Sequence, residues 1–159
     1  MSIKQILIIG TLLTMMNSWS QNLTCDDFKT GEFYIPQTSV SKSYTIVSND
    51  SIRKIDKERD KQVQQYIVIR DIKTQTEWKN GINNGNPTYE KIEWIDKCSY
   101  RLTYDESKME LDEYENWVNS NKGIIVSKIN IENKCMFYDA TMTTNEGQTI
   151  SQKGQICKK

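Results

Sequence analysis

Two cysteines near the C-terminus, Cys135 and Cys157, restrict the fold of this 159-residue chain more than any other feature. They lie at equal distances on either side of the turn-forming stretch NEG at 145–147. The flanking segments 135–143 and 148–157 read as strands, so we expect a hairpin centred on the glutamate of that turn. In this hairpin the two cysteines are cross-strand neighbours, about 4.5 Å apart between Cα atoms, which is close enough for a disulfide.

The other two cysteines, Cys25 and Cys98, complete an even set of four. An even number in an exported chain favours disulfides, and four cysteines allow three connectivities. The hairpin pair leaves Cys25–Cys98 by elimination. A metal site of four thiolates or a redox-active dithiol are the alternatives, but both use closely spaced cysteines, whereas these are scattered singly. We therefore predict two structural disulfides.

The first twenty residues resemble a signal peptide. Lys4 gives a positive start, Ile6 to Met16 is an apolar run, and Ser18 and Ser20 are small residues where a signal peptidase would cleave. The run is shorter than the roughly 20 residues that span a bilayer. A buried N-terminal helix or strand is the alternative. We predict that residues 1–20 are removed and that 21–159 form one exported domain in the periplasm, cell envelope or medium, without a transmembrane segment.

A lipid anchor at Cys25 is the other possibility for the N-terminus. The residue before that cysteine is Thr24, where a lipoprotein signal requires a small Gly, Ala or Ser. We therefore assign Cys25 to disulfide pairing.

The amino-acid composition argues against several classes of function. The chain contains no histidine, so it has no imidazole base and no histidine metal ligand. Its 21 basic and 21 acidic side chains balance, which argues against nucleic acid and against electrostatic attachment to an anionic membrane. We predict no catalytic residues, no cofactor and no metal site.

Most of the domain carries strand signals. The segment Cys98 to Tyr104 alternates cleanly between Cys, Tyr, Leu and Tyr on one face and polar residues on the other. The stretch from Asn80 to Pro87 is the clearest loop, and the charged stretch 51–62 reads as a solvated loop. Besides the hairpin, we expect strands at 31–36, 43–47, 63–70, 74–78, 89–95, 98–104 and 123–131. These predict a mainly β fold of about seven strands, a curved or partly closed antiparallel sheet resembling a lipocalin-like half barrel.

One helix is expected near 107–122. Ser107 and Glu110 have the spacing of a capping box, and Gly123 suits the C-terminal cap. Its apolar residues fall on one side, which we expect to pack on the sheet.

Two segments resemble the signature segments of a family of small, uncharacterised exported bacterial β-proteins. The first is CDDFKTGEF from Cys25 to Phe33, and the second is IEWIDKCSYRLTY from Ile92 to Tyr104. The family pattern is Cys-x-x-Phe-Lys-Thr-Gly-x-Phe followed later by Trp-x-x-x-Cys-x-Tyr-x-Leu. The resemblance implies a Cys25–Cys98 disulfide and no known activity. The stretch 51–62, the helix and the pair Cys135–Cys157 depart from the pattern.

Three functional hypotheses follow. The first is a non-enzymatic binding or structural module that contacts an envelope or extracellular protein through the loop at 80–87 or through acidic residues near the helix, namely Glu106, Glu110, Asp112, Glu113 and Glu115. The alternative is that both regions are only solvated surface.

The second hypothesis is a carrier of a small apolar ligand. Its cavity would be lined by Trp78, Trp94, Tyr100 and Phe137, and the alternative is that these side chains simply fill the core. The third is a carboxylate-based hydrolase, for which Asp26 and Asp27 are the adjacent acids. Neighbouring residues of a strand point to opposite faces, so these two are poorly placed to act on one bond.

Overall fold

The computed structural model describes residues 22–36 and 63–159. The expected signal peptide, the expected strand at 43–47 and the charged stretch 51–62 lie outside the described residues. The described elements are the 3-10 helix η1 (Cys25–Phe28), the strands β1 (Gly31–Pro36), β2 (Gln65–Arg70), β3 (Thr74–Lys79), β4 (Thr88–Trp94) and β5 (Ser99–Tyr104), the helix α3 (Glu113–Ser120), and the strands β6 (Ile124–Glu132), β7 (Cys135–Thr143) and β8 (Thr149–Lys158).

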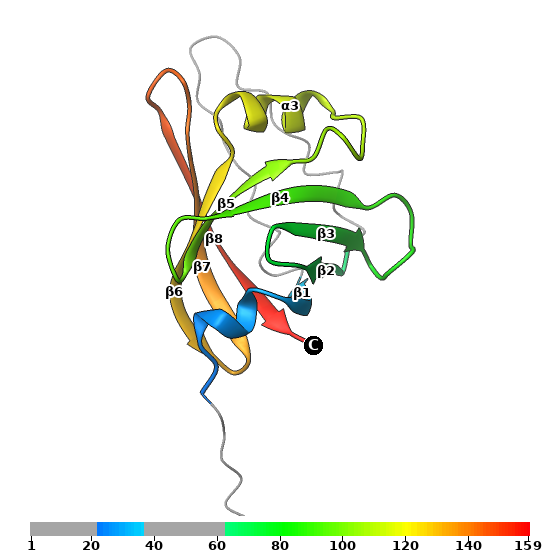
Figure 1. The fold of residues 1–159 in the computed structure, drawn as a ribbon, viewed down its shortest axis with the longest axis vertical. Helices are drawn as coiled ribbons and strands as arrows, with labels where there is room; N and C mark the ends of the chain where they lie inside the picture. Colours follow the sequence, from blue (N-terminus) through cyan, green and yellow to red (C-terminus); the bar gives the residue numbers. More distant parts are fainter. Residues whose placement is uncertain (1–21, 37–62) are drawn as a thin grey trace, which may run out of the picture.

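The described strands form a closed antiparallel barrel in which each strand pairs with the next along the chain (Figure 1). The first strand closes the barrel by pairing with the last, at Phe33 with Lys158 and Tyr34 with Cys157. The predicted mainly β fold is confirmed, but the barrel has eight strands and is closed, where the sequence indicated about seven strands and partial closure. Pairing between residues more than 120 positions apart leaves no local sequence pattern, which explains the difference.

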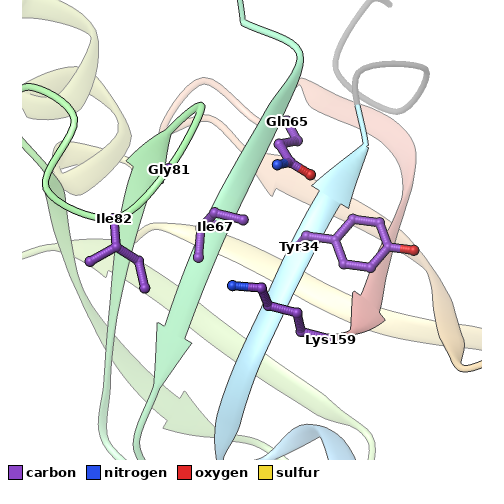
Figure 2. Close-up of a pocket in the computed structure, with 6 residues that line it drawn as sticks. All are labelled: Tyr34, Gln65, Ile67, Gly81, Ile82 and Lys159. Carbon is purple, nitrogen blue, oxygen red and sulfur yellow. The ribbon is translucent and has the colours of Figure 1, made fainter.

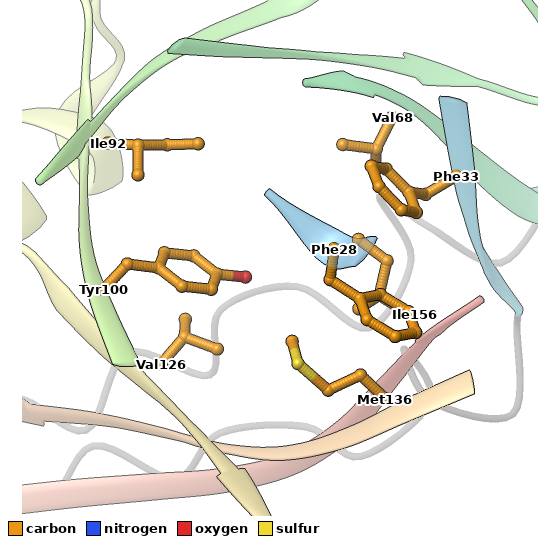
Figure 3. Packing of buried hydrophobic residues seen from close by; sticks show 8 residues of the cluster. All are labelled: Phe28, Phe33, Val68, Ile92, Tyr100, Val126, Met136 and Ile156. Carbon is orange, nitrogen blue, oxygen red and sulfur yellow. The ribbon is translucent and has the colours of Figure 1, made fainter. Parts of the chain in front are cut away.

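Side chains along each strand alternate between the interior and the outer wall of the barrel. On β1 and β2, Tyr34 and Ile67 are cross-strand partners that point outward (Figure 2). Their neighbours Phe33 and Val68 are also partners and point inward (Figure 3). Because directly opposed residues share a face, the strand register assigns the other residues of the sheet to the interior or to the wall.

The apolar core lies inside the barrel toward the end closed by η1. Figure 3 shows Phe28 of η1 among inward side chains from the surrounding strands. Phe28 and Phe33 are fully buried and stack with ring centroids 5.8 Å apart. Burying one such ring stabilises the fold by about 1.5–3 kcal/mol. The core cluster consists of Phe28, Phe33, Val68, Ile92, Tyr100, Val126, Met136 and Ile156.

Both predicted disulfides are present. Cys25–Cys98 ties η1 to the turn before β5, with a Cα–Cα distance of 5.2 Å. Cys135 and Cys157 are cross-strand partners on β7 and β8, with a Cα–Cα distance of 3.9 Å. All four cysteines are therefore paired, which leaves no thiolate for a metal. Two disulfides in a chain of this size are typical of exported proteins.

The helix α3 is shorter than predicted and begins later. Asp112 is its N-cap, and the reciprocal hydrogen bonds between Asp112 and Glu115 form the capping box, at 2.8 and 2.9 Å. The Ser107 hydroxyl instead donates to Asp105 at 2.6 Å. The prediction of a Ser107–Glu110 box is therefore wrong. Two successive stretches, 107–110 and 112–115, carry the same spacing, and Ser107 is held in the turn before the helix.

Gly123 connects α3 to β6 and allows a close backbone contact. It has a φ of +80°, and a Cβ at this position would lie 2.2 Å from the Leu102 carbonyl oxygen. We expect Gly123→Ala to lower the free energy of unfolding by about 3 kcal/mol, because backbone strain and a steric clash add together. Gly147→Ala is the matched control. Its φ is +82° and nothing lies within 4 Å of the added Cβ, so it should cost only about 1 kcal/mol in urea unfolding. Equal losses would show that the clash is relieved by small shifts.

Candidate functional site

Five polar side chains lie inside the barrel, and we refer to them as the interior polar cluster: Arg70, Gln75, Glu77, Glu90 and Tyr100. They come from four consecutive strands, β2 to β5. The register pairs Arg70 with Gln75, Gln75 with Glu90, and Val68 with Glu77. Because Val68 points into the core, these partners and their alternate neighbours point inward as well.

Arg70 is the centre of the cluster and is only 4% exposed. Its Nε and Nη2 atoms donate to Gln75 Oε1 at 2.9 and 2.7 Å. Nη2 also donates to the Tyr100 hydroxyl at 2.9 Å, and Nη1 donates to the Phe28 carbonyl at 2.9 Å. The guanidinium lies 4.7 Å from the centroid of the Tyr100 ring. The Arg70 guanidinium therefore connects the wall of the barrel to η1, which closes one end of the barrel.

Gln75 links the arginine to both glutamates. Its Oε1 atom accepts from Arg70, which fixes the orientation of the amide. Its Nε2 atom then donates to Glu77 Oε1 at 2.9 Å and to Glu90 Oε2 at 2.5 Å. Two carboxyl groups are thus held against one nitrogen atom, with one guanidinium nearby. Fully ionised, the cluster would carry one more negative charge than positive.

The environment favours protonation of both glutamates. Burial raises the pKa of Glu77 to about 7, and the positive charges of Arg70 and Lys79 only partly oppose this. Burial also raises the pKa of Glu90 well above its usual range, and repulsion from Glu77 adds to the effect. Hydrogen bonding to Gln75 and the charge of Arg70 oppose it. At neutral pH the pair can therefore offer both a proton donor and an ionised acceptor.

The protein should be more stable at pH 5.5 than at pH 8, by about 1 kcal/mol or more. Between pH 4.5, the ordinary pKa of a glutamate, and about 7, the folded chain holds a proton at Glu77 that the unfolded chain releases. The stabilisation is complete below that window and is lost as the pH rises through 7. Urea unfolding at the two pH values measures it.

Two variants control this comparison. Glu77→Gln should reduce the difference between the two pH values, whereas Glu93→Gln, on an exposed side chain of β4, should leave it unchanged. Four carboxyl groups have a lowered pKa, and their contribution to the free energy of unfolding is lost only as the pH falls below about 4. It therefore does not differ between pH 5.5 and pH 8. These groups are Asp26, Asp27, Asp96 and Asp105. Identical stabilities at both pH values would mean that Glu77 ionises as a solvated glutamate does.

Aromatic residues extend the interior toward α3, which lies at the end of the barrel opposite η1 (Figure 1). Tyr104 is the cross-strand partner of Glu90. Its ring contacts Tyr114 of α3 edge to face at 6.4 Å, and Tyr114 lies 6.1 Å from Trp117. Asn119 fixes the helix to β5 by accepting from Tyr104 N at 2.8 Å and donating to Tyr104 O at 3.0 Å. The interior polar cluster therefore lies between η1 at one end of the barrel and the aromatic residues of α3 at the other.

Only two of the four residues expected to line a cavity face the interior. Trp94 and Tyr100 are cross-strand partners with rings 5.0 Å apart. The Trp94 indole donates to the Ile72 carbonyl at 2.8 Å, at the η1 end of the barrel. Trp78 is the partner of outward-facing Ile67, and Phe137 lies next to inward-facing Met136, so both point outward.

The other expected contact residues are scattered. The loop 80–87 is exposed at its tip, with Asn80 and Asn83 at positive φ. Glu106 and Glu110 precede α3, while Asp112 and Glu115 are engaged in its capping box. Of the five expected acids, only Glu113 and Glu115 lie within α3, so the five do not lie on one face of the helix.

No local sequence pattern indicates that Arg70, Gln75, Glu77 and Glu90 form a site. Each occupies an inward position in a strand that also carries apolar outward residues, such as Trp78 beside Glu77 and Ile69 beside Arg70. The available signal was strand register. Once Val68 is placed in the core, its cross-strand partner Glu77 must also point inward.

Neither a metal site nor a membrane-spanning helix is found in the described part of the chain. Among residues 22–36 and 63–159, no group of three or more His, Cys, Asp or Glu side chains is arranged to hold a metal ion. No described helix is long and apolar enough to cross a bilayer.

Comparison of the chain with models of protein families, with curated proteins and with solved structures finds no match. The resemblance of the segments at Cys25–Phe33 and Ile92–Tyr104 to an exported family stays a prediction.

Proposed function

We propose that this chain is an exported, non-enzymatic binding protein that holds a small amphipathic amine inside its barrel, at the interior polar cluster. An eight-stranded barrel has an interior just wide enough to be filled by side chains or to hold one small ligand. Its disulfide-linked scaffold suits an oxidising compartment.

The observation that carries the proposal is that two carboxyl groups share one amide nitrogen beside a single cation, Arg70, so that burial favours the protonated form of at least one of them. A barrel that served only as a scaffold would be more stable with apolar side chains at the buried Glu90 and the half-buried Glu77, because ionisable groups withdrawn from water are costly. Residues that break the rules of core packing are concentrated at functional sites. A ligand ammonium would allow both carboxyl groups to ionise, with its apolar part against the aromatic residues below α3.

A matched pair of compounds tests this ligand class. We expect n-octylamine to raise the melting temperature of the protein at pH 8, whereas n-octanol, which lacks the charge, should have little effect. Binding should weaken at pH 6, because protons compete with the ammonium for Glu77 and Glu90.

The variants Glu77→Gln and Glu90→Gln should each weaken amine binding at least tenfold, while the exposed control Glu93→Gln should not. Equal stabilisation by octylamine and octanol, or equal binding by all three variants, would contradict the proposed site. Hydrolysis of a glycoside substrate that is lost in Glu77→Gln or Glu90→Gln would instead favour the carboxylate-based hydrolase.

A further inference from the structure

A pocket of about 390 Å³ lies on the outer wall of the barrel (Figure 2). Outward-facing residues of β1 and β2 form its walls together with the loop after β3 and Lys159, the last residue of the sequence. Pockets of roughly 300–1,000 Å³ accommodate small organic ligands. The lining residues are Tyr34, Gln65, Ile67, Gly81, Ile82 and Lys159. None belongs to the interior polar cluster, so this pocket is a separate site.

The lining is mostly apolar. Ile67 points outward yet is only 3% exposed, which places it deep in the pocket, while Ile82 at the rim is 43% exposed. Tyr34 is the cross-strand partner of Ile67 on one side, and Trp78 is its partner on the other. Outward apolar side chains of β1 and β2 and of the loop after β3 thus meet in the pocket, and Trp78 lies on the adjoining strand. They would remove the apolar body of a ligand from water.

Lys159 supplies a positive charge at the edge of this apolar surface. Figure 2 shows its side chain extending across β1 toward Ile67. Its ammonium pairs with Glu32, but the two side chains are 54% and 41% exposed. An ion pair this exposed contributes less than about 1 kcal/mol, so a ligand anion can replace Glu32 at little cost. Gln65 adds an amide on the opposite side.

We propose that the outer pocket binds a small amphipathic anion, a carboxylate or sulfonate with an aromatic or aliphatic body. The apolar body lies against Tyr34, Ile67 and Ile82, and the anionic group meets the Lys159 ammonium. This site takes a ligand of the opposite charge to the one proposed for the interior, so either site can exist without the other.

Two fluorescent dyes with similar aromatic bodies test the proposal on the full mature chain. One is 8-anilinonaphthalene-1-sulfonate, which carries a sulfonate, and the other is N-phenyl-1-naphthylamine, which is neutral. We expect the anionic dye to bind one site with an affinity about two- to fivefold above that of the neutral dye, since an exposed ion pair contributes up to about 1 kcal/mol.

Matched variants locate the dye. Ile82→Asp should weaken the anionic dye at least tenfold, because it introduces a like charge into the rim. Ile72→Asp changes an equally exposed isoleucine (45%) outside the pocket and should not weaken it. Lys159→Gln should abolish the preference for the anion, whereas Lys153→Gln on the exposed side of β8 should keep it.

Equal affinity for the two dyes would overturn the anion preference, and absence of saturable binding would overturn the site. Anionic dye binding that survives both Ile82→Asp and Lys159→Gln would place the dye elsewhere and also overturn the proposal. A dye-induced shift of the Ile82 amide resonance that needs a few-fold more anionic dye in Lys159→Gln, and no more in Lys153→Gln, is the supporting result.

Discussion

Replacement of Cys25 and Cys98 by alanine together is expected to lower the free energy of unfolding by about 4 kcal/mol. The two cysteines are 73 residues apart, so their bond removes a large amount of entropy from the unfolded chain. The bond also holds η1, whose Phe28 is fully buried in the end of the barrel. Urea unfolding of the oxidised protein and of the variant measures the difference.

The hairpin disulfide provides the comparison for this prediction. Cys135 and Cys157 are only 22 residues apart and already face each other in the β7–β8 ladder. Replacing both by alanine should cost less, about 3.4 kcal/mol at most. A smaller loss for the Cys25–Cys98 variant than for the hairpin variant would show that η1 is held by packing alone.

Arg70→Met is expected to lower the free energy of unfolding by about 3–5 kcal/mol at pH 8. Methionine fills much of the same volume but removes the hydrogen bonds to Gln75, Tyr100 and the Phe28 carbonyl. Both glutamates then lose the only cation within the cluster. Urea unfolding at fixed pH measures the loss.

Two further variants identify the cause of that loss. Arg101→Met removes an arginine whose ion pair with Glu93 lies on the exposed surface, and it should cost no more than about 1 kcal/mol. Adding Glu90→Gln to Arg70→Met should recover part of the stability, because one uncompensated carboxyl group is removed. A double variant with the full sum of the two losses would mean that Arg70 and Glu90 are not coupled.

The predictions from sequence succeeded where the signal was local. The hairpin around residues 145–147 set the Cys135–Cys157 register correctly, because a short turn fixes which residues face each other. The alternation in Cys98–Tyr104 likewise identified β5 and its inward tyrosines. Both inferences needed only neighbouring residues.

The failures arose where the decisive information was not local. Trp78 was expected inside because it is large and apolar, but its register with Ile67 points it outward. Glu77 has no local signal of its position, because a lone acidic residue in a short strand usually faces water, whereas here it is opposed to Val68. Placing Trp78 on the outer wall and Glu77 in the interior requires knowledge of their pairing partners on β2.

The interior polar cluster likewise depends on strand pairing that the local sequence does not reveal. Arg70, Gln75 and Glu90 lie on three different strands, and nothing in the spacing of positions 70, 75 and 90 indicates that their side chains meet. Pairing of β1 with β2, which places Gly31 opposite Arg70, brings Phe28 beside Arg70 across 42 positions of sequence. Such a site becomes visible only after the topology is known.

The most direct test of a ligand in the barrel is the intact mass of the mature protein recovered from the cells that make it, under native and then denaturing conditions. We expect a native mass that exceeds the chain mass and falls to it on denaturation, with four hydrogens lost to the two disulfides. The extra mass should be absent from Glu77→Gln and Glu90→Gln and present in Glu93→Gln. A bare, fully oxidised chain in the native spectrum of the unsubstituted protein would contradict the ligand site and leave the interior polar cluster with a structural role only.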